Sequence, residues 1–327
     1  MILPSVELYI ADSESNTQYK MSDVITNAEY YTTLLPQPGK LAFTVIDLTE
    51  KQFCEGSNVV LAVDGKKIFD GYLFTRTRTE KDTMQCVAYD RLRYLSNKDT
   101  KIFVNKTPED IFTEVCGQLG LTSKVVSGSG YTLPPVVYDN KSYYQMVTEA
   151  LENSLVANGK YLILRDNVGT VEMVDVATLT TNVLIGDAKL LTGFQFESSI
   201  DKNTFNVIKL VQENKKEKAR NAYITKDSET IRKWGQLQYF KKVDNDASAA
   251  QIETMGSQML RLYNRKTRTL QVTCFGDLQI RAGSGVDLQI SKLSNEGIAN
   301  SQTVFVSECT HTFTKEHHTM SLNLEVV

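Results

Sequence analysis

Residues alternate with a period of two in several short runs near the start of the chain. The runs at 41–46, 59–63 and 84–88 are rich in β-branched and aromatic residues, which is typical of strands. Asp64-Gly65 separates two such runs and favours a tight hairpin, because a type I′ turn requires positive φ. Residues 1–97 are therefore predicted to form a small antiparallel β-barrel or sandwich.

The next stretch, residues 98–190, changes to a helical period. Thr107-Pro108 is a typical helix start, because a hydroxyl can cap the first turn and proline suits the first helical position. A second helix is expected to begin at Ser142 and to end at Asn158-Gly159, and a hairpin is expected across Asn167–Gly169. This pattern predicts a small α+β domain.

Residues 191–327 return mostly to strands, with one helix expected from about 249 to 263. All six prolines precede position 136, and the net charges of residues 1–100, 101–190 and 191–327 are −3, −3 and +3. This shift in composition supports a boundary near residue 190. The chain is thus predicted to be mainly β with an α+β insert, divided into domains 1–97, 98–190 and 191–327.

Composition and motifs exclude several classes of function. A net charge of −3 argues against a generally basic nucleic-acid binder, and no apolar run approaches the length of a membrane span. The N-terminus lacks the pattern of a signal peptide, and five scattered cysteines are expected to stay reduced. No GxSxG, HExxH or glycine-rich phosphate loop occurs, so no cofactor and no catalytic residue is assigned.

Two weaker hypotheses concern reactive side chains. Cys309 and His311 share a strand face and could belong to a metal site, although packing is favoured because no second ligand pair has suitable spacing. Cys116 could be a nucleophile, but it falls inside a predicted helix and not at the N-terminus, where a thiol pKa would be lowered. Neither reading leads to a predicted metal or catalytic site.

One stretch of the last domain is strongly basic. Residues 215–242 carry nine basic and three acidic side chains, interleaved with Tyr223, Trp234, Tyr239 and Phe240. Such a combination can bind single-stranded nucleic acid, or it can be a solvated loop or a surface that docks an acidic protein. We favour docking or a solvated loop over nucleic-acid binding because the rest of the chain is acidic. The candidate docking residues are Lys215, Lys216, Lys218, Arg220, Lys241 and Lys242.

An ordered series of short strings resembles a known family. They are Gly39–Val45, Phe53–Val59, Ile68–Phe74, Ala88–Leu95, Asn97–Thr100, Asn105–Pro108, Thr225–Leu237, Asn264–Leu270 and Gly276–Val286. Their order and spacing over nearly the whole chain resemble the baseplate hub proteins of the PBSX group of phage-like elements. Those proteins are similar to the hub and late-control D proteins of contractile phage tails and phage-tail-like bacteriocins.

The resemblance implies a structural protein and not an enzyme. It implies two tail-tube-type antiparallel β-barrels that flank the small α+β domain, and a homotrimer that adapts a sixfold tail tube to a threefold central spike. The implied partners are the tail tube protein, the central spike protein, other baseplate proteins including a LysM-type hub partner, and the tape measure protein. No membrane and no stable nucleic-acid binding are expected.

The resemblance also implies where the protein is located. The protein would assemble in the cytoplasm of the host bacterium and end in the tail baseplate of a phage or bacteriocin particle. The alternative function is a tail-associated peptidoglycan hydrolase, because some relatives of this group are described as hydrolases.

Overall fold

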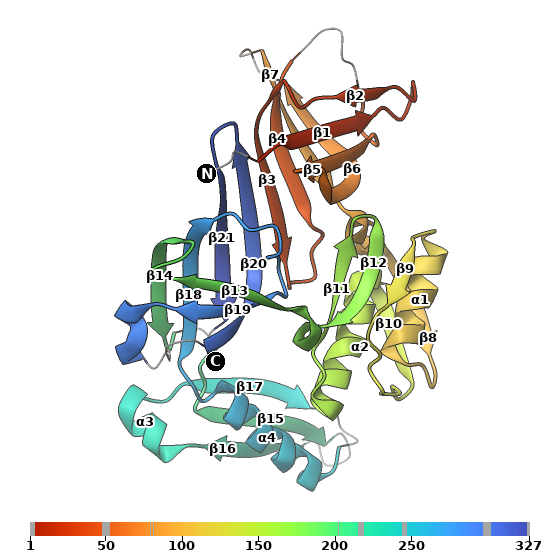
Figure 1. The fold of residues 1–327 in the computed structure, drawn as a ribbon. Coiled ribbons are helices and arrows are strands. Elements are labelled where there is room, and N and C mark those ends of the chain that lie inside the picture. The colour runs from red at the N-terminus through yellow and green to blue at the C-terminus, as the bar shows by residue number, and fades with distance from the viewer. Residues whose placement is uncertain are drawn as a thin grey trace. The chain divides into compact units, whose positions relative to one another are not determined.

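The computed structural model describes the chain except for residues 1–3, 48–52, 79, 81, 202, 215–218, 244–246, 297–301 and 326–327. The chain divides into two compact units (Figure 1). The large unit comprises Met1–Gln195 and Gln271–Val326, and the small unit comprises Phe196–Leu270. None of the helices in the described ranges is both long and apolar enough to cross a membrane.

The elements of the large unit follow the order that the sequence predicts, with strands at both ends and helices between them. Its N-terminal strands are β1 (Val6–Ala11), β2 (Gln18–Lys20), β3 (Ile25–Thr33), β4 (Lys40–Ile46), β5 (Asn58–Val63), β6 (Lys66–Arg78) and β7 (Thr83–Tyr89). Its middle elements are β8 (Lys98–Phe103), α1 (Pro108–Gln118), β9 (Ser123–Val125), β10 (Val136–Ser142), α2 (Tyr143–Asn158), β11 (Leu162–Asn167) and β12 (Thr170–Asp175). Its C-terminal strands are β13 (Thr180–Gly186), β14 (Leu191–Ser199), β18 (Thr267–Phe275), β19 (Gly285–Gln289), β20 (Gln302–Thr314) and β21 (His318–Glu325), of which β14 ends and β18 begins within residues 196–270.

A single large sheet joins the two ends of the chain. Its strand order is β14-β18-β21-β20-β3-β4-β7-β6-β5-β1-β2, with β19 and β13 attached to the side of β20. The antiparallel pair β20 and β3, in register from Glu308↔Thr33 to Thr314↔Asn27, connects the C-terminal strands to the N-terminal ones (Figure 1). The fold is therefore mainly β and antiparallel, as expected.

The predicted pair of closed barrels is not present in the strand pairings. The path of hydrogen-bonded strands runs from β14 to β2 without returning to its start, so the described strands close no barrel. The physical reason is the β20–β3 pair, because an edge of each strand set is used to join the other set instead of closing on itself.

Alternation builds the core of the N-terminal strands. Leu41, Phe43 and Val45 of β4 all point inward and are buried, as the period of two predicts. The predicted hairpin between β5 and β6 turns at Asp64-Gly65, where both residues have positive φ (51° and 76°).

The two predicted helices of the middle region are confirmed. Thr107 caps α1 through a reciprocal pair of hydrogen bonds with Asp110, and Ser142 caps α2 in the same way through Gln145. The apolar faces of α1 and α2 pack with β8, β10, β11 and β12 around one hydrophobic cluster. Gly159 ends α2 in the left-handed conformation at φ 75°, which glycine adopts without strain.

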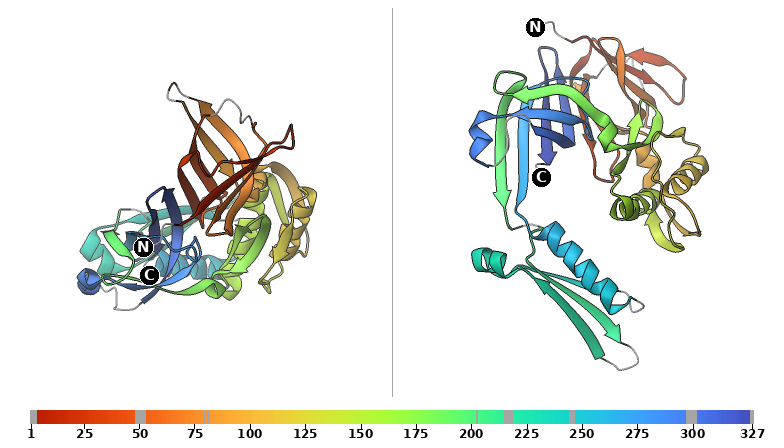
Figure 2. Two further views of the ribbon diagram at one scale, coloured as in Figure 1. Left: turned by 45° about the horizontal axis from the view of Figure 1, so that its top comes forward. Right: turned by 60° about the horizontal axis from the view of Figure 1, so that its bottom comes forward.

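The small unit is built from β15 (Val207–Asn214), β16 (Ala219–Lys226), α3 (Ser228–Trp234), β17 (Gln238–Val243) and α4 (Ala249–Tyr263). The sheet order is β16-β15-β17, with β16 antiparallel and β17 parallel to β15. Helix α4, which the sequence predicts at this place, covers one face of the sheet (Figure 2). The chain leaves the large unit at Gln195 and returns at Gln271, so residues 196–270 form a unit of their own inside the predicted third domain.

Candidate docking surface

The six candidate docking residues do not all fall on described parts of the chain. Lys215, Lys216 and Lys218 lie outside the described residues. Arg220 lies on β16, and Lys241 and Lys242 lie on β17, and all three side chains are exposed. The geometry of the surface is therefore set by the sheet of the small unit.

On the face of this sheet that points away from α4, side chains of the three strands form rows across the sheet. In one row Ile224 of β16 and Phe240 of β17 both lie beside Lys209 of β15. Because side chains alternate along a strand, the neighbouring rows on this face place Lys242 beside Val211 and Arg220 beside Glu213. We call this surface the cationic face, and its members are Lys209, Val211, Glu213, Arg220, Ala222, Ile224, Lys226, Phe240 and Lys242.

The opposite face of the sheet is occupied by α4. Tyr223 and Tyr239 pack there with Ile208, Leu210 and Ile252. Lys241 is in register with Leu210 and so lies on the α4 side of β17. The structure therefore brings Arg220 and Lys242 onto one face and places Lys241 on the other.

Electrostatic pairing on the cationic face is partial. The Glu213 carboxylate lies 3.0 Å from the Lys242 ammonium and 3.6 Å from the Arg220 guanidinium. These pairs are exposed, so each contributes only about 0–1 kcal/mol to stability. With Lys209 and Lys226, the face carries four cations and one carboxylate, which suits an anionic partner.

Apolar side chains accompany these charges. Ile224 is 57% exposed and Phe240 is 52% exposed. Exposed side chains of this size next to cations favour a protein surface over a purely electrostatic contact. Sequence reasoning missed Lys209 and Ile224, which only the register of β15 with its two neighbours brings to Phe240.

The aromatic residues of the basic stretch do not form one stacking platform. Tyr239 packs against Tyr263 with ring centroids 5.5 Å apart and against Phe205 at 5.2 Å, inside the small unit. Trp234 is the last residue of α3. Only Phe240 of the four predicted aromatics lies on the cationic face, whereas binding of single strands uses successive exposed rings.

The candidate cysteines and histidines are packed. Cys116 is buried in α1, and burial raises the pKa of its thiol to about 12. Cys309 and His311 are buried on β20, and both approach the carbonyl oxygen of Ile280, which lies 2.7 Å from His311 Nε2. Within the described residues, no group of three or more potential ligands is placed to hold a metal ion.

His311 also contacts His318 across the final hairpin. The Nε2 atom of His311 must carry the proton that it donates to Ile280, so its Nδ1 atom is free to accept from His318 Nε2 at 3.0 Å. Burial lowers the pKa of His311. The pKa of His318 is lowered to about 4, chiefly by burial and second by the nearby His311 ring. Both rings are thus neutral in the fold at pH 7.

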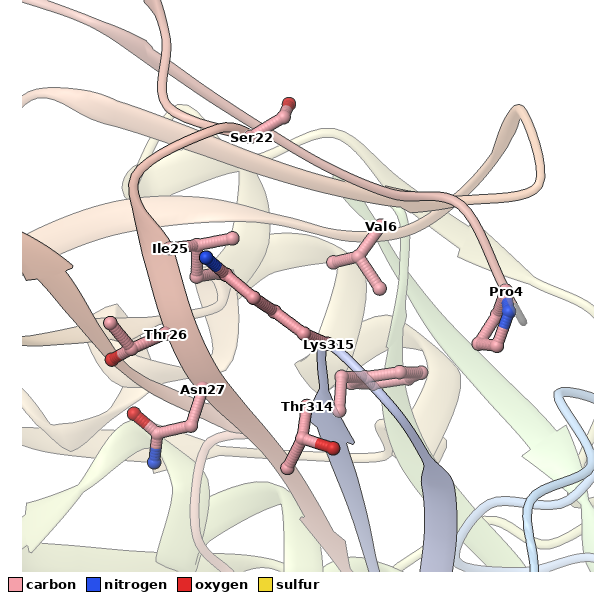
Figure 3. A pocket seen from close by; sticks show the side chains of 9 residues that line it. Pro4, Val6, Ser22, Ile25, Thr26, Asn27, Thr314 and Lys315 are labelled. Carbon is pink, nitrogen blue, oxygen red and sulfur yellow. The ribbon is translucent and has the colours of Figure 1, made fainter.

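A separate cavity of about 170 Å³ lies beside the start of β3 (Figure 3). Val6, Ile25 and Thr314 line it, and the Lys315 side chain extends toward Ile25. Among the described residues that line this cavity, Lys315 is the only charged one, so they form no cluster of groups that could perform acid–base chemistry.

Sequence comparison identifies relatives over most of the chain. A family model described as YQBQ-like matches residues 28–325. The phage-like element PBSX protein XkdQ of Bacillus subtilis (strain 168) is 28% identical over 290 residues, which cover 85% of this chain and 84% of that protein.

Structure comparison finds a similar fold in a prophage tail protein and in a type VI secretion component. The 43 kDa tail protein of prophage MuSo2 from Shewanella oneidensis superposes with a TM-score of 0.72 at 12% identity, over 99% of this chain and 98% of that one. The Escherichia coli c3393 protein has a TM-score of 0.56 at 9% identity, over 93% of this chain and 74% of its own. That protein is a type VI secretion component with structural similarity to the bacteriophage T4 tail proteins gp27 and gp5.

Proposed function

Because this chain belongs to the YQBQ-like family, we propose that it is a structural baseplate hub in the contractile tail of a phage or phage-tail-like bacteriocin. The observation that carries the proposal is the pairing of β20 with β3, which joins two strand sets into one sheet. A tail protein of a prophage shares this fold over nearly its whole length. An extensive sheet that joins both ends of the chain suits a part whose work is to hold its neighbours in place.

The proposed hub is a homotrimer. Each chain contributes two strand sets, β1–β7 and the C-terminal set with β13, β14 and β18–β21. Three chains would supply six sets, which is the number needed to meet a sixfold tube above a threefold spike. In this proposal the two sets correspond to the tube-type domains, residues 1–97 and 191–327, and residues 98–190 form the smaller domain between them, from whose end β13 joins the second set.

The sheet edges support an assembled state. Strands β14 and β2 end the large sheet, and the described residues provide no further strand beside either one. Exposed edges of this kind invite pairing with another chain unless a neighbour covers them. We propose that neighbouring hub chains, the tail tube protein and the central spike protein cover these edges in the particle.

We also propose a role for the cationic face. Its cations and its exposed Ile224 and Phe240 would dock an acidic, partly apolar surface of another baseplate protein or of a neighbouring hub chain. Lys215, Lys216 and Lys218, which lie outside the described residues, stay proposed docking residues because of their charge alone. The other proposed neighbours are a LysM-type hub partner and the tape measure protein.

The test is the mass of the assembly. The purified chain would be mixed with the spike protein encoded beside it, and the complex would be weighed by mass photometry or light scattering. Three copies of the 36.8 kDa chain per spike trimer are expected. A stable dimer, or any assembly with twofold symmetry, would contradict the hub proposal.

A further inference from the structure

The outer edge of β11 borders an apolar groove in the large unit. The sheet order β11-β12-β9 makes β11 an edge strand among the described strands (Figure 1). The groove has a volume of about 120 Å³. Leu151 and Leu155 of α2 line one side of it, and Leu34 and Pro36 of the turn after β3 line the other.

The backbone groups of this edge can be assigned from the hairpin register. Val176 N–H donates to the Tyr161 carbonyl, so in antiparallel alternation Ile163 bonds to β12 while Leu162, Leu164 and Asp166 point their backbone groups outward. The outward carbonyl of Asp166 accepts a hydrogen bond from the Arg281 guanidinium at 2.7 Å. A side chain therefore satisfies the edge at that end.

The other end of the β11 edge, next to the groove, differs in its hydrogen bonding. Within the described parts of the chain, no backbone or side-chain group bonds to the outward N–H and C=O groups of Leu162 and Leu164. Buried backbone groups without partners are costly, so this short edge is a site that a further strand would satisfy.

The groove reaches both faces of the edge strand. The side chains of Leu162 and Leu164 pack with the α2 cluster, whereas Ile163 packs on the opposite side with Leu34. A strand added to β11 would therefore place alternate side chains against Leu155 and against Leu34.

One charge lies in this groove. Glu152 of α2 is exposed and is the only charged side chain that lines the groove within the described residues. A lone carboxylate beside an otherwise apolar lining favours a partner that carries a cation at the matching position.

We propose that the β11 edge and its groove bind an extended peptide segment of another polypeptide as an added strand. The segment carries apolar side chains for Leu155 and Leu34 and a lysine or arginine for Glu152. Main-chain hydrogen bonds to Leu162 and Leu164 provide affinity, and the groove provides the selection of side chains. The inference stands on the large unit alone and does not rest on the hub proposal.

The test uses the full chain and a defined probe, the fluorescein-labelled hexapeptide Lys-Val-Leu-Val-Thr-Thr, with binding measured by fluorescence anisotropy. In an extended strand its lysine and leucine share the face toward Glu152 and Leu155, and its two valines share the face toward Leu34. Neighbouring amides of a strand point to opposite edges, so N-methylation of the two central amides removes the one donor of that pair that faces β11, and it keeps the side chains. We expect binding to weaken about tenfold or more after N-methylation, because each lost hydrogen bond costs about a factor of ten when its partner stays unpaired.

Two variants of α2 locate the site. Leu155→Asn, in the groove, is expected to weaken binding, and its matched control Val156→Asn, at the neighbouring residue that is 82% exposed and outside the groove, is expected to leave binding unchanged. Glu152→Lys is expected to weaken binding of the probe by up to about fivefold. The probe with glutamate in place of lysine should then bind the Glu152→Lys variant better than the original chain.

Four outcomes would overturn the proposal. One is no binding of the probe up to about 1 mM, the limit of weak specific binding. Another is equal binding of the N-methylated and unmodified peptides, and a third is equal binding to the Leu155→Asn and Val156→Asn variants. Self-association of the chain that Leu155→Asn abolishes would show that a second copy fills the groove instead.

Discussion

At the scale of single residues, burial decides what the reactive side chains can do. Cys309 sits next to His311, which is the arrangement that suggested chemistry in the sequence, but both side chains are buried. Burial raises the pKa of Cys309, so its thiol stays protonated and is a poor nucleophile. Both ring nitrogens of His311 are already hydrogen-bonded, one to the Ile280 carbonyl and the other to His318. The pair therefore fixes the final hairpin and is not prepared for catalysis.

This assignment predicts no cell-wall hydrolysis. A peptidoglycan zymogram of the purified chain should show no cleared zone, because neither a thiolate nor an available base is formed at Cys309 and His311. Cys309→Ser should leave assembly of particles intact. Clearing by the original chain that disappears in Cys309→Ser or His311→Gln, with folding unchanged, would support the hydrolase alternative.

The histidine pair also predicts a dependence of stability on pH. The folded pKa of His318, about 4, lies below its value of 6.5 in an unfolded chain. The unfolded chain therefore binds the proton first as the pH falls, so stability is complete above about pH 6.5 and is lost progressively toward pH 4. After a discount for the partial exposure of the ring, the loss is about 1–2 kcal/mol.

The measurement is the free energy of unfolding in urea between pH 7 and pH 4.5. His318→Gln should lose less stability over this range than the original chain, because its side chain does not titrate. His317→Gln is the matched control, since the His317 side chain is 71% exposed, and it should follow the original chain. Parallel losses in all three proteins would show that His318 is not responsible.

At the scale of elements, the sequence predicts local structure better than it predicts partners. The caps at Thr107 and Ser142 place both helices of the middle region correctly, because capping and helical period act within a few residues. Nothing local indicates that β20 pairs with β3, since the paired residues Glu308 and Thr33 are brought together only by the whole fold. For the same reason the prediction of closed barrels failed while the prediction of antiparallel strands was confirmed.

The docking residues illustrate the same limit. Composition alone selects the basic stretch, and it groups Lys241 with Lys242 because they are neighbours in the sequence. A strand turns such neighbours to opposite faces, so the sheet separates them and adds Lys209 and Ile224 instead. The period of two is visible in the sequence, but the register between three strands is not.

The contact of α4 with its sheet yields a prediction at this scale. Gly256 lies in the middle of α4, where glycine costs about 1 kcal/mol relative to alanine. A Cβ atom at this position would lie 2.7 Å from Thr225 Oγ1 on β16, so the close approach explains the glycine. Gly256→Ala should destabilise the small unit by about 1–2 kcal/mol, because the overlap outweighs the gain in helix propensity.

A double variant separates the two effects. In Gly256→Ala with Thr225→Ala the overlap is gone, so stability should recover relative to Gly256→Ala alone. Trp234 is the single tryptophan of the chain and belongs to the small unit, so its fluorescence during denaturation reports this unit. If the double variant is no more stable than the sum of its parts predicts, the contact with Thr225 is not the cause.

At the scale of the whole molecule, opposite charges are separated along the chain. Residues 1–190 carry a net charge of −6, whereas residues 191–327 carry +3. The cationic face gathers part of that positive charge on the small unit, and apolar Ile224 and Phe240 lie among its cations. Acidic regions and a cationic face in the same chain can attract each other between copies, which would support the proposed trimer.

The last prediction concerns the rate of that assembly. Lys242→Gln and Arg220→Gln together should slow incorporation of this protein into particles, because charges on an exposed docking face accelerate encounter more than they stabilise the complex. Lys241→Gln is the matched control, since it removes the same charge one residue away on the opposite face of β17. Glu213→Gln should have the reverse effect and speed incorporation, because it removes the carboxylate that pairs with Lys242.

Salt distinguishes this account from its competitors. The differences should be largest at low salt and should shrink well above 0.1 M, where the screening length is about 10 Å. Incorporation would be measured as the amount of each variant in particles purified from a strain that produces it. Association rates with purified partners would be measured at several salt concentrations. Equal slowing by Lys241→Gln and Lys242→Gln would show that net charge and not the cationic face matters. Normal assembly of the Lys242→Gln, Arg220→Gln protein together with lost binding of single-stranded DNA would replace docking with nucleic-acid binding.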